Sequence, residues 1–323
     1  MRRHFVHFLW GSLLAILGLV FVFFISVWNG WVGYMPDMDE LSNPIDKFAS
    51  QVYSSDQQLI GTWNADNNNR VAIDYNGLSP HLVHALVATE DERFYEHSGV
   101  DFIALGRAVV KRGVMGQASA GGGSTITQQL AKQLFSEKAH STVERLLQKP
   151  IEWIIAVKLE RYFTKEEILA MYFNYFDFLH NAVGIKRAAN VYFNKEPRKL
   201  TVTESAMLVG LCKNPSMFNP LRHPERCLQR RNVVLMQMVK SGYVTKDEYK
   251  ELSQRPLGLH FTRSKPVSGA GDYFQAFLRQ YMMAKKPERE NYQSWQNRQF
   301  VLDSIAWEQD PLYGWCNKNR KPD

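Results

Sequence analysis

Residues 88–101 read ATEDERFYEHSGVD, and the interpretation of the rest of the chain depends on this stretch. An apolar run at residues 82–88 leads into three consecutive acidic residues: Glu90, Asp91 and Glu92. A carboxylate at the edge of an apolar helix is a candidate general base. The alternative is a solvated helix end, because most charge runs lie on solvated faces. The aromatic residue, histidine, glycine and aspartate that follow closely favour a functional site.

Length and composition limit the classes of protein to consider. The chain has 323 residues, of which 45% are hydrophobic and 22% are charged, so we expect one sizeable domain with appendages. The formal net charge of +7 suits nucleic acid, an anionic membrane surface or a phosphate-bearing substrate. No known nucleic-acid-binding motif is present, so we expect no nucleic-acid partner and favour the other two.

The N-terminus predicts a membrane anchor. Residues 8–28 form an uncharged apolar run, which as a helix spans roughly 30 Å, the thickness of a bilayer core. Arg2 and Arg3 precede the run, so the positive-inside rule places residues 1–7 in the cytoplasm and the remaining domains outside. A cleaved signal peptide is the weaker alternative, because no small-residue cleavage site follows Trp28.

Beyond the anchor, a small β appendage precedes a helical body. Residues 29–47 read as an irregular connector, and short strands are expected at residues 51–53, 59–63 and 70–73. From Ser79 the periodicity is helical, so the body at residues 48–255 is predicted to be mostly α. The expected helices begin near Ser79, Thr127, Val143, Thr164, Thr201, Pro224 and Thr245.

The C-terminal part changes in character. Residues 256–323 are largely polar with scattered tryptophans, and only the region around residues 274–281 suggests another amphipathic helix. We interpret this part as a linker or as the start of a truncated C-terminal module. No serine in the chain is followed three residues later by lysine, so the acylatable Ser-x-x-Lys of penicillin-binding transpeptidases is absent.

The three cysteines carry no predicted function. Their number is odd, and the spacing of Cys212, Cys227 and Cys316 fits no metal site. A bond between Cys212 and Cys227 is one alternative in an oxidising compartment. We favour small buried apolar side chains, as free cysteines usually are.

A second motif at residues 121–132 reads GGGSTITQQLAK. Glycines let a backbone approach a ligand closely, and the N–H groups at the start of the following helix attract anions such as phosphate. Lys132 adds a compact positive charge later on that helix. The Gly-Lys-Ser/Thr order of a P-loop is missing, and the alternative is a flexible linker before a capped helix.

Glu152 lies within the apolar sequence PIEWII at residues 150–155. Its carboxylate is either exposed on a polar helix face or placed in an unusual apolar environment. Together with Glu90 it forms a pair of carboxylates on separate helices. Such pairs serve glycosyl transfer, in which one group moves a proton and the other manages charge.

Five motifs together resemble the peptidoglycan glycosyltransferase family of penicillin-binding proteins, in its order and spacing. They are Glu90-Asp91-x-x-Phe94-x-x-His97-x-Gly99-x-Asp101, residues 122–135, Lys149-x-x-Glu152, Lys165-x-x-Ile168-Leu169-x-x-Tyr172-x-Asn174, and residues 184–220. The resemblance covers about residues 48–255 and the single anchor helix.

The resemblance implies a lysozyme-like, mostly α fold with a small membrane-embedded jaw lobe. Residues 107–120 are assigned to the jaw, with an ordinary amphipathic surface helix as the alternative. The implied location is the bacterial inner membrane, with a single pass and an extracytoplasmic catalytic domain. Membrane lipids and other cell-wall synthesis proteins are candidate partners.

The resemblance also implies the chemistry. The enzyme would polymerise lipid II onto a growing glycan strand of β-1,4 linkages, with inversion at the anomeric carbon and release of undecaprenyl pyrophosphate. Glu90 would be the general base, and Glu152 would assist near the pyrophosphate, through a divalent cation such as Mg²⁺ or Mn²⁺ whose ligands are unknown. The implied substrate-binding residues are Asp91, Phe94, His97, Ser124, Thr125, Gln128, Gln129, Lys132, Lys149, Tyr172 and Asn174.

Some positions depart from the family pattern. Gln148 stands where the third motif usually has arginine, Gln133 replaces an asparagine, and residues 176–180 differ from the usual run. These departures affect substrate contacts more than the reaction class. Two other functions remain open at this point: a lysozyme-like lytic hydrolase and a non-catalytic scaffold for cell-wall assembly.

Overall fold

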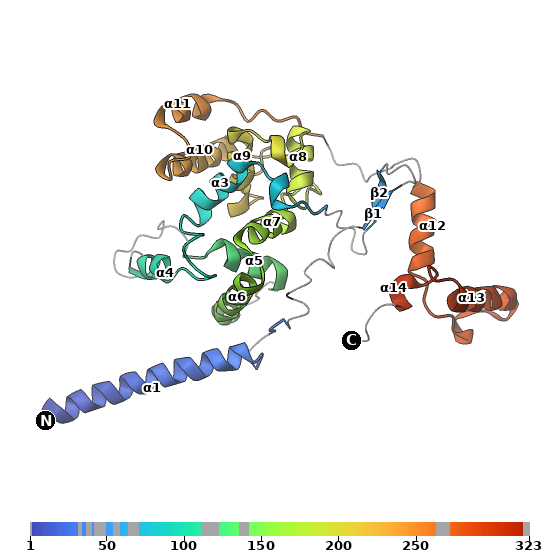
Figure 1. Cartoon of the computed structure of the whole chain (residues 1–323), viewed down its shortest axis with the longest axis horizontal. Helices are drawn as coiled ribbons and strands as arrows, with labels where there is room; N and C mark the ends of the chain where they lie inside the picture. Colours follow the sequence, from blue (N-terminus) through green and yellow to red (C-terminus); the bar gives the residue numbers. More distant parts are fainter. Residues whose placement is uncertain are drawn as a thin grey trace. The chain divides into compact units, whose positions relative to one another are not determined.

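The computed structural model describes residues 2–31, 34–36, 41, 50–53, 59–63, 71–110, 123–135, 142–262 and 272–318 (Figure 1). The chain divides into two compact units. The first comprises residues 1–48 and 70–264, and the second comprises residues 49–69 and 265–323. The predicted predominance of helix is confirmed for the described part of the chain.

The N-terminal helix α1 (Arg2–Trp28) contains a stretch, Val6–Trp28, that is long and apolar enough to cross a membrane. Its last turns contact α6 (Thr142–Tyr162). Phe24 stacks on Trp153 with ring centroids 6.4 Å apart, and the Lys158 ammonium lies 5.0 Å from the Trp28 ring centroid. A cation over an indole face is an attractive contact. The end of the anchor is therefore packed against the first unit.

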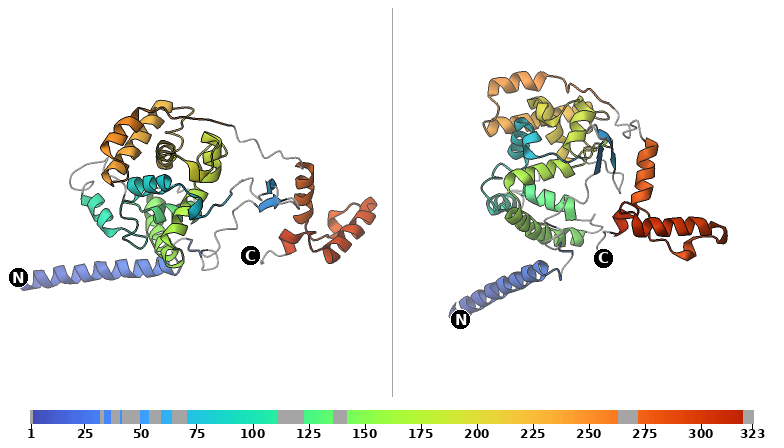
Figure 2. Two further views of the ribbon diagram at one scale, coloured as in Figure 1. Left: turned by 45° about the horizontal axis from the view of Figure 1, so that its top comes forward. Right: turned by 45° about the vertical axis from the view of Figure 1, so that its right-hand side comes forward.

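Two groups of helices build the body of the first unit (Figure 2). Helix α3 (Pro80–Glu90) packs on α9 (Val202–Lys213) and α10 (Pro224–Lys240). Helix α5 (Ile126–Phe135) packs on α6 and on α7 (Lys165–Tyr175). The shorter helices are α4 (Phe102–Val109), α8 (Ile185–Phe193) and α11 (Lys246–Gln254). One continuous apolar core joins both groups, since Leu86, Leu130 and Tyr172 are fully buried in it.

Local sequence signals set the helix starts. Three helices begin with a capping box, in which a threonine hydroxyl accepts from the N3 backbone N–H and a glutamate reaches back to the threonine N–H. The pairs are Thr164 with Glu167, Thr201 with Glu204, and Thr245 with Glu248. The helix start predicted at each of these threonines is therefore confirmed.

The β appendage is confirmed for two strands. Strand β1 (Ser50–Tyr53) pairs antiparallel with β2 (Leu59–Trp63). The third strand, expected at residues 70–73, is wrong for the described residues 71–73, which form no strand. The reason is that both backbone groups of Ile73 are hydrogen-bonded to the Asn174 side chain instead of to a strand. The Asn174 amide accepts from the Ile73 N–H at 3.2 Å and donates to the Ile73 carbonyl at 2.9 Å.

The second unit is more structured than the predicted linker. It combines the β1–β2 hairpin with α12 (Asp272–Met282), α13 (Asn297–Gln309), α14 (Trp315–Lys318) and the 3-10 helices Arg289–Asn291 and Ser294–Gln296. The sequence suggested that the hairpin belongs to the helical body. Strand β2 contacts α12 instead, so the hairpin belongs to the second unit. The scattered aromatic residues contact one another, as Tyr281 and Tyr313 do with centroids 4.9 Å apart.

The jaw prediction is testable only at its start. Residues 107–110 complete α4, and the other residues of the predicted jaw segment, 111–120, lie outside the described residues, as do Gly121 and Gly122. The described Gly123 packs on α4, since a Cβ there would lie 3.3 Å from the Ala108 Cβ.

The cysteine interpretation is confirmed. All three cysteines are free, Cys212 and Cys227 are buried, and the alternative bond between these two is wrong. Burial raises the pKa of the Cys227 thiol to about 12 and raises the pKa of Cys212 still further. Because these folded-state pKa values exceed the unfolded value, both thiols favour folding at low pH and lose that contribution as pH rises above roughly 8.5.

We therefore expect selective alkylation of the native protein. Iodoacetamide at pH 8 should modify the partly exposed Cys316, because the thiolate is the reactive form and buried neutral thiols are inert. Cys212 and Cys227 should react only after denaturation. Peptide mass spectrometry measures the three sites separately, and native labelling of Cys212 to the same extent as Cys316 would contradict the described packing.

Gly99 is the point at which the first motif touches α6. Its φ is +91°, and a Cβ there would lie 2.7 Å from the backbone carbon of Ala156. Gly242 has a similar φ of +77° but has no atom within 4 Å of the added Cβ. The two glycines thus separate backbone strain from steric overlap.

Gly99→Ala should lower the free energy of unfolding by at least about 2 kcal/mol, because both strain and overlap apply. Gly242→Ala should cost only about 1 kcal/mol, because only the left-handed backbone penalty applies. Thermal unfolding of the full chain in detergent measures both. Equal losses in the two variants would show that the close approach to α6 does not matter.

Candidate active site

Helix α3 carries Glu90 to the surface of the first unit. Pro80 begins the helix, and the Ser79 hydroxyl donates to the Leu200 carbonyl at 2.9 Å, which ties the helix start to the segment before α9. The helix ends at Glu90, and Asp91 then takes an extended φ of −157°. The two neighbouring carboxylates therefore diverge: the Glu90 side chain is 18% exposed and the Asp91 side chain only 4%.

Glu90 is held by contacts from two other helices. The Gln129 amide of α5 donates to Oε2 at 3.0 Å, and the Arg230 guanidinium of α10 lies 3.5 Å from Oε1. The Tyr172 hydroxyl donates to the Gln129 Oε1 at 3.1 Å, which fixes the orientation of that amide. The carboxylate thus sits at a defined position between a cation and a neutral donor.

The groups beneath Glu90 stay protonated. Burial raises the pKa of Tyr172 well above its usual value, and the negative charge of Glu90 adds to this effect. Burial lowers the pKa of the Arg230 guanidinium, and Glu90 opposes that change. Arginine remains charged even so, because its ordinary pKa is above 12. Arg230 therefore supplies positive charge to the carboxylate from a largely buried position.

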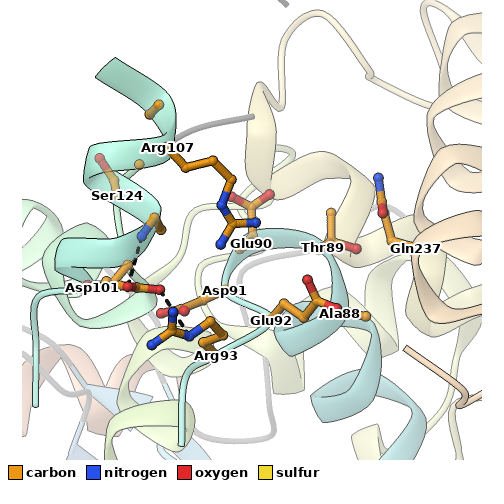
Figure 3. Close-up of a pocket in the computed structure, with 14 residues that line it drawn as sticks. Ala88, Thr89, Glu90, Asp91, Glu92, Arg93, Asp101, Arg107, Ser124 and Gln237 are labelled. Atoms are coloured by element: carbon orange, nitrogen blue, oxygen red, sulfur yellow. Dashed lines mark hydrogen bonds and ion pairs between the residues drawn. The ribbon is translucent and has the colours of Figure 1, made fainter. Parts of the chain in front are cut away.

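Glu90 opens into a pocket of about 210 Å³ between the end of α3, the start of α4 and the start of α5 (Figure 3). Its lining mixes both signs of charge with small polar groups. The charged and polar residues of the lining include Glu90, Asp91, Glu92, Arg93, Asp101, Arg107, Ser124, Thr125 and Gln237. Figure 3 shows the Arg107 side chain extending from α4 into this pocket. Arg93 lies 3.7 Å from Asp101, so one of the two arginines is engaged by an acid.

The second predicted carboxylate connects to the pocket through Ser124. Lys149 lies 2.6 Å from the Glu152 carboxylate and donates to the Ser124 hydroxyl at 3.5 Å. Glu152 is buried, whereas the Lys149 side chain is 42% exposed. Glu152 itself does not line the pocket. It therefore acts on the pocket by orienting Lys149 beside Ser124.

Asp91 and His97 form part of the framework. The Asp91 carboxylate contacts the His97 Nε2 at 3.0 Å and accepts from the Ile126 backbone N–H at 3.1 Å. The carboxylate thus caps the start of α5, where N–H groups lack partners within the helix. Both side chains are almost fully buried, but Asp91 also lines the pocket, so the predicted substrate contact of these two residues stays a prediction.

Three further predicted contacts also serve packing. Phe94 is fully buried in the core, and the Asn174 amide is hydrogen-bonded to the backbone of Ile73, so neither side chain reaches the pocket. The Gln128 amide makes its hydrogen bonds to backbone groups of the protein: it donates to the Gly99 carbonyl at 3.4 Å and accepts from the Thr125 N–H at 3.4 Å. In the described structure these residues shape the site from within the protein, and their direct contact with substrate stays a prediction.

Other predicted residues lie at or near the pocket. Ser124 and Thr125 line it, and the Thr125 hydroxyl donates to the Gly99 carbonyl at 2.6 Å. Gln129 and Tyr172 are connected to the pocket indirectly: Gln129 donates to Glu90, and the Tyr172 hydroxyl donates to Gln129. Lys132 is exposed one turn after Gln129 on the same side of α5, but it does not line the described pocket. Its contact with substrate stays a prediction.

Three arginines of the site, Arg93, Arg107 and Arg230, were not predicted as site residues. Arg230 comes from α10, far along the sequence, and reaches Glu90 because Gly210 of α9 lies close to it: a Cβ there would be 3.2 Å from the Arg230 Cγ. Arg107 was assigned to the jaw. The only sequence signal for Arg230 is an arginine pair, residues 230–231, on an amphipathic helix, which is too common a pattern to identify a site.

The described residues offer no preformed metal cage. Among them no group of three or more histidine, cysteine, aspartate or glutamate side chains could hold an ion. The Glu152 carboxylate, which the sequence analysis linked to Mg²⁺ or Mn²⁺, is already paired with Lys149. Hard cations prefer several oxygen ligands, so these side chains do not fit a protein-held divalent ion.

Comparison with known proteins agrees with this site. The family model described as transglycosylase matches residues 56–239, which include Glu90, Ser124, Lys149, Glu152 and Arg230. The chain therefore belongs to the transglycosylase family.

The curated relatives are penicillin-binding proteins. Penicillin-binding protein 1A of Aquifex aeolicus is 37% identical over 279 residues, which cover 86% of this chain and 36% of the relative. Penicillin-binding protein 1A of Escherichia coli is 36% identical over 248 residues, covering 77% of this chain and 28% of the relative. Penicillin-binding protein 1F of Bacillus subtilis is 34% identical over 269 residues, covering 83% and 35%. The chain thus spans about a third of the length of these relatives.

The framework role of Asp91 predicts a loss of stability. Asp91→Ala should lower the free energy of unfolding by about 2–4 kcal/mol, because it leaves the Ile126 N–H and the buried His97 without their acceptor. Glu92→Ala should change it by no more than about 0.5 kcal/mol, because the neighbouring side chain is exposed. Thermal unfolding in detergent provides the comparison, and equal stability of the two variants would refute the role of Asp91.

Proposed function

We propose that this protein polymerises lipid II into β-1,4 glycan strands. The observation that carries the proposal is Glu90, held by Gln129 and Arg230 at a pocket that the start of α5 borders. Glycosyl transfer needs a base for the acceptor hydroxyl and positive charge for the leaving group. Both kinds of group belong to this site.

Glu90 is the proposed general base. It accepts the proton of the acceptor sugar's 4-hydroxyl as that oxygen forms a bond to the anomeric carbon of the donor, and the bond from that carbon to the pyrophosphate oxygen breaks. A single displacement of this kind inverts the configuration. The hydrogen bond from Gln129 and the charge of Arg230 hold the carboxylate in a defined orientation before the reaction.

The pyrophosphate leaving group gains negative charge in the transition state. Lys149 beside Ser124 is the proposed partner for that charge, and the N–H groups at the start of α5 add to it. Arg107 and Lys132 are further candidate cations. Cations that meet charge only as it develops accelerate the chemical step rather than ground-state binding.

A divalent cation, Mg²⁺ or Mn²⁺, is proposed only as an ion that enters the site together with the pyrophosphate of the substrate. The pyrophosphate and water would have to supply most of its ligands, because the described side chains provide no cage. No step of the mechanism above passes through such an ion. Comparing rates with and without a chelator tests the proposal directly.

The location is proposed from α1 and the residues before it. Arg2 and Arg3 favour a cytoplasmic N-terminus, which places the catalytic unit outside the inner membrane. A lipid-linked substrate suits a site that is tied to a membrane helix. Membrane lipids, the growing glycan strand and other cell-wall synthesis proteins are the proposed partners.

The test is a pair of substitutions at acidic residues of one loop region. Glu90→Gln should lower the rate of glycan synthesis from lipid II by at least about 100-fold, because the base is lost while the side-chain volume is kept. Glu96→Gln should leave the rate unchanged, because Glu96 contacts Arg93 on the surface and does not line the pocket.

The product is sized by gel electrophoresis after incubation of the purified full chain with lipid II. Polymer made by Glu90→Gln at the unmodified rate would refute the general-base role. Release of soluble sugars from finished glycan, without polymer, would instead favour the lytic hydrolase.

A further inference from the structure

The second unit contains a cavity of its own. Its volume is about 820 Å³, and α12, the loop at residues 283–288, the 3-10 helix Arg289–Asn291 and α13 surround it. All its lining residues lie between Phe277 and Tyr313, beyond the residues that match the transglycosylase family. The volume falls in the range of ligand-binding pockets. The catalytic mechanism proposed above uses none of these residues.

One wall of the cavity is aromatic. Phe277 and Tyr281 lie one turn apart on α12, with centroids 5.7 Å apart and rings inclined by 29°. Tyr313 meets Tyr281 edge to face at 4.9 Å. The Phe277 side chain is 54% exposed although it is large and apolar. Aromatic faces of this kind, rigid and open to solvent, suit the C–H faces of sugar rings.

A fixed carboxylate faces the aromatic wall. Asp303 of α13 accepts from the Tyr292 hydroxyl at 2.8 Å and from the Gln299 amide at 2.8 Å. Burial and the hydrogen bond to Asp303 raise the pKa of Tyr292 to about 12, so the tyrosine remains the donor. The Tyr313 hydroxyl also hydrogen-bonds Asp303. A carboxylate accepts hydrogen bonds through about four lone-pair sites, which is more than these three donors use. The inside of the cavity therefore favours a ligand with hydroxyl or amide donors.

Two cations stand at the edge of the same cavity. Lys285 and Lys286 line it, Glu288 adds one carboxylate nearby, and neither lysine takes part in an ion pair within the described part of the second unit. An ammonium group is a compact donor that attracts carboxylates and phosphates. Since Asp303 repels an anion in the interior, a negative group of the ligand is accommodated beside the lysines instead.

We propose that this cavity binds an acidic saccharide: a chain of pyranose rings with hydroxyl and amide donors on the rings and carboxylates on their substituents. A peptidoglycan glycan strand has this chemistry, so the identification of the ligand as the enzyme's own product rests on the proposed function. The site would hold a finished part of the strand outside the catalytic unit. An uncharged sugar would satisfy the aromatic wall but not the lysines, and a polyphosphate would satisfy the lysines but not Asp303.

The test measures binding directly, without turnover. The full chain in detergent is titrated calorimetrically with peptide-free glycan strands of alternating N-acetylglucosamine and N-acetylmuramic acid. Oligomers of N-acetylglucosamine serve as the uncharged comparison, and polyphosphate serves as the anion without sugar. We expect the acidic strands to bind at least about tenfold more tightly than either, with an affinity that falls as salt rises.

Phe277→Ala should weaken binding of the acidic strands about tenfold, because the exposed ring face is lost. Lys285→Gln with Lys286→Gln should remove most of the salt dependence. Trp295→Ala is the matched control, because Trp295 is 79% exposed in the same unit but does not line the cavity. Circular dichroism and thermal unfolding confirm that each variant is folded.

The possible results are distinct. Absence of binding by the acidic strands, equal affinity for the uncharged oligomers, or unchanged affinity in Phe277→Ala would overturn the inference. Binding by a protein that makes no polymer from lipid II would leave the site in place and refute the proposed function. Polymer synthesis without strand binding would support the proposed function and refute the strand-binding site.

Discussion

The buried contact of Asp91 with His97 and with the Ile126 N–H determines the architecture of the catalytic unit. It removes one carboxylate of an acidic run from solvent and uses it to join the end of α3 to the start of α5. Helix α3 ends at Glu90, and the Asp91 side chain is 4% exposed whereas that of Glu90 is 18% exposed. Asp91 thus serves the framework, while its neighbour Glu90 is the proposed general base, although their side chains are almost alike.

A second constraint is the close helix packing around Glu90. Gly210 lets α9 and α10 approach, which places the Arg230 guanidinium beside the carboxylate. The pair is partly buried, and desolvation of two charges is offset only when the geometry also provides hydrogen bonds. Gln129, held by the Tyr172 hydroxyl, provides one. The proposed base is therefore positioned by side chains from α5, α7 and α10, although it belongs to α3.

Much of the helical body could be predicted because its signals are local. Capping boxes at Thr164 and Thr245 and apolar periodicity depend on residues a few positions apart. The prediction of a third strand was wrong because the backbone of Ile73 is hydrogen-bonded to a side chain distant in sequence, that of Asn174. Glu90, Ser124 and Lys149 could be proposed from motifs, whereas Arg230 could not. Its role arises only when α10 packs on α3 and α9, and no pattern within α10 encodes that contact.

The contact between α1 and α6 has a consequence for the site. Trp153, which stacks on Phe24 of the apolar helix, lies about one turn after Lys149 on α6. Where α1 crosses a bilayer, this contact places the lysine that donates to Ser124 within about one helical turn of the residue that packs on the outer end of the membrane helix. A cation so close to the bilayer suits a diphosphate at the level of the lipid headgroups.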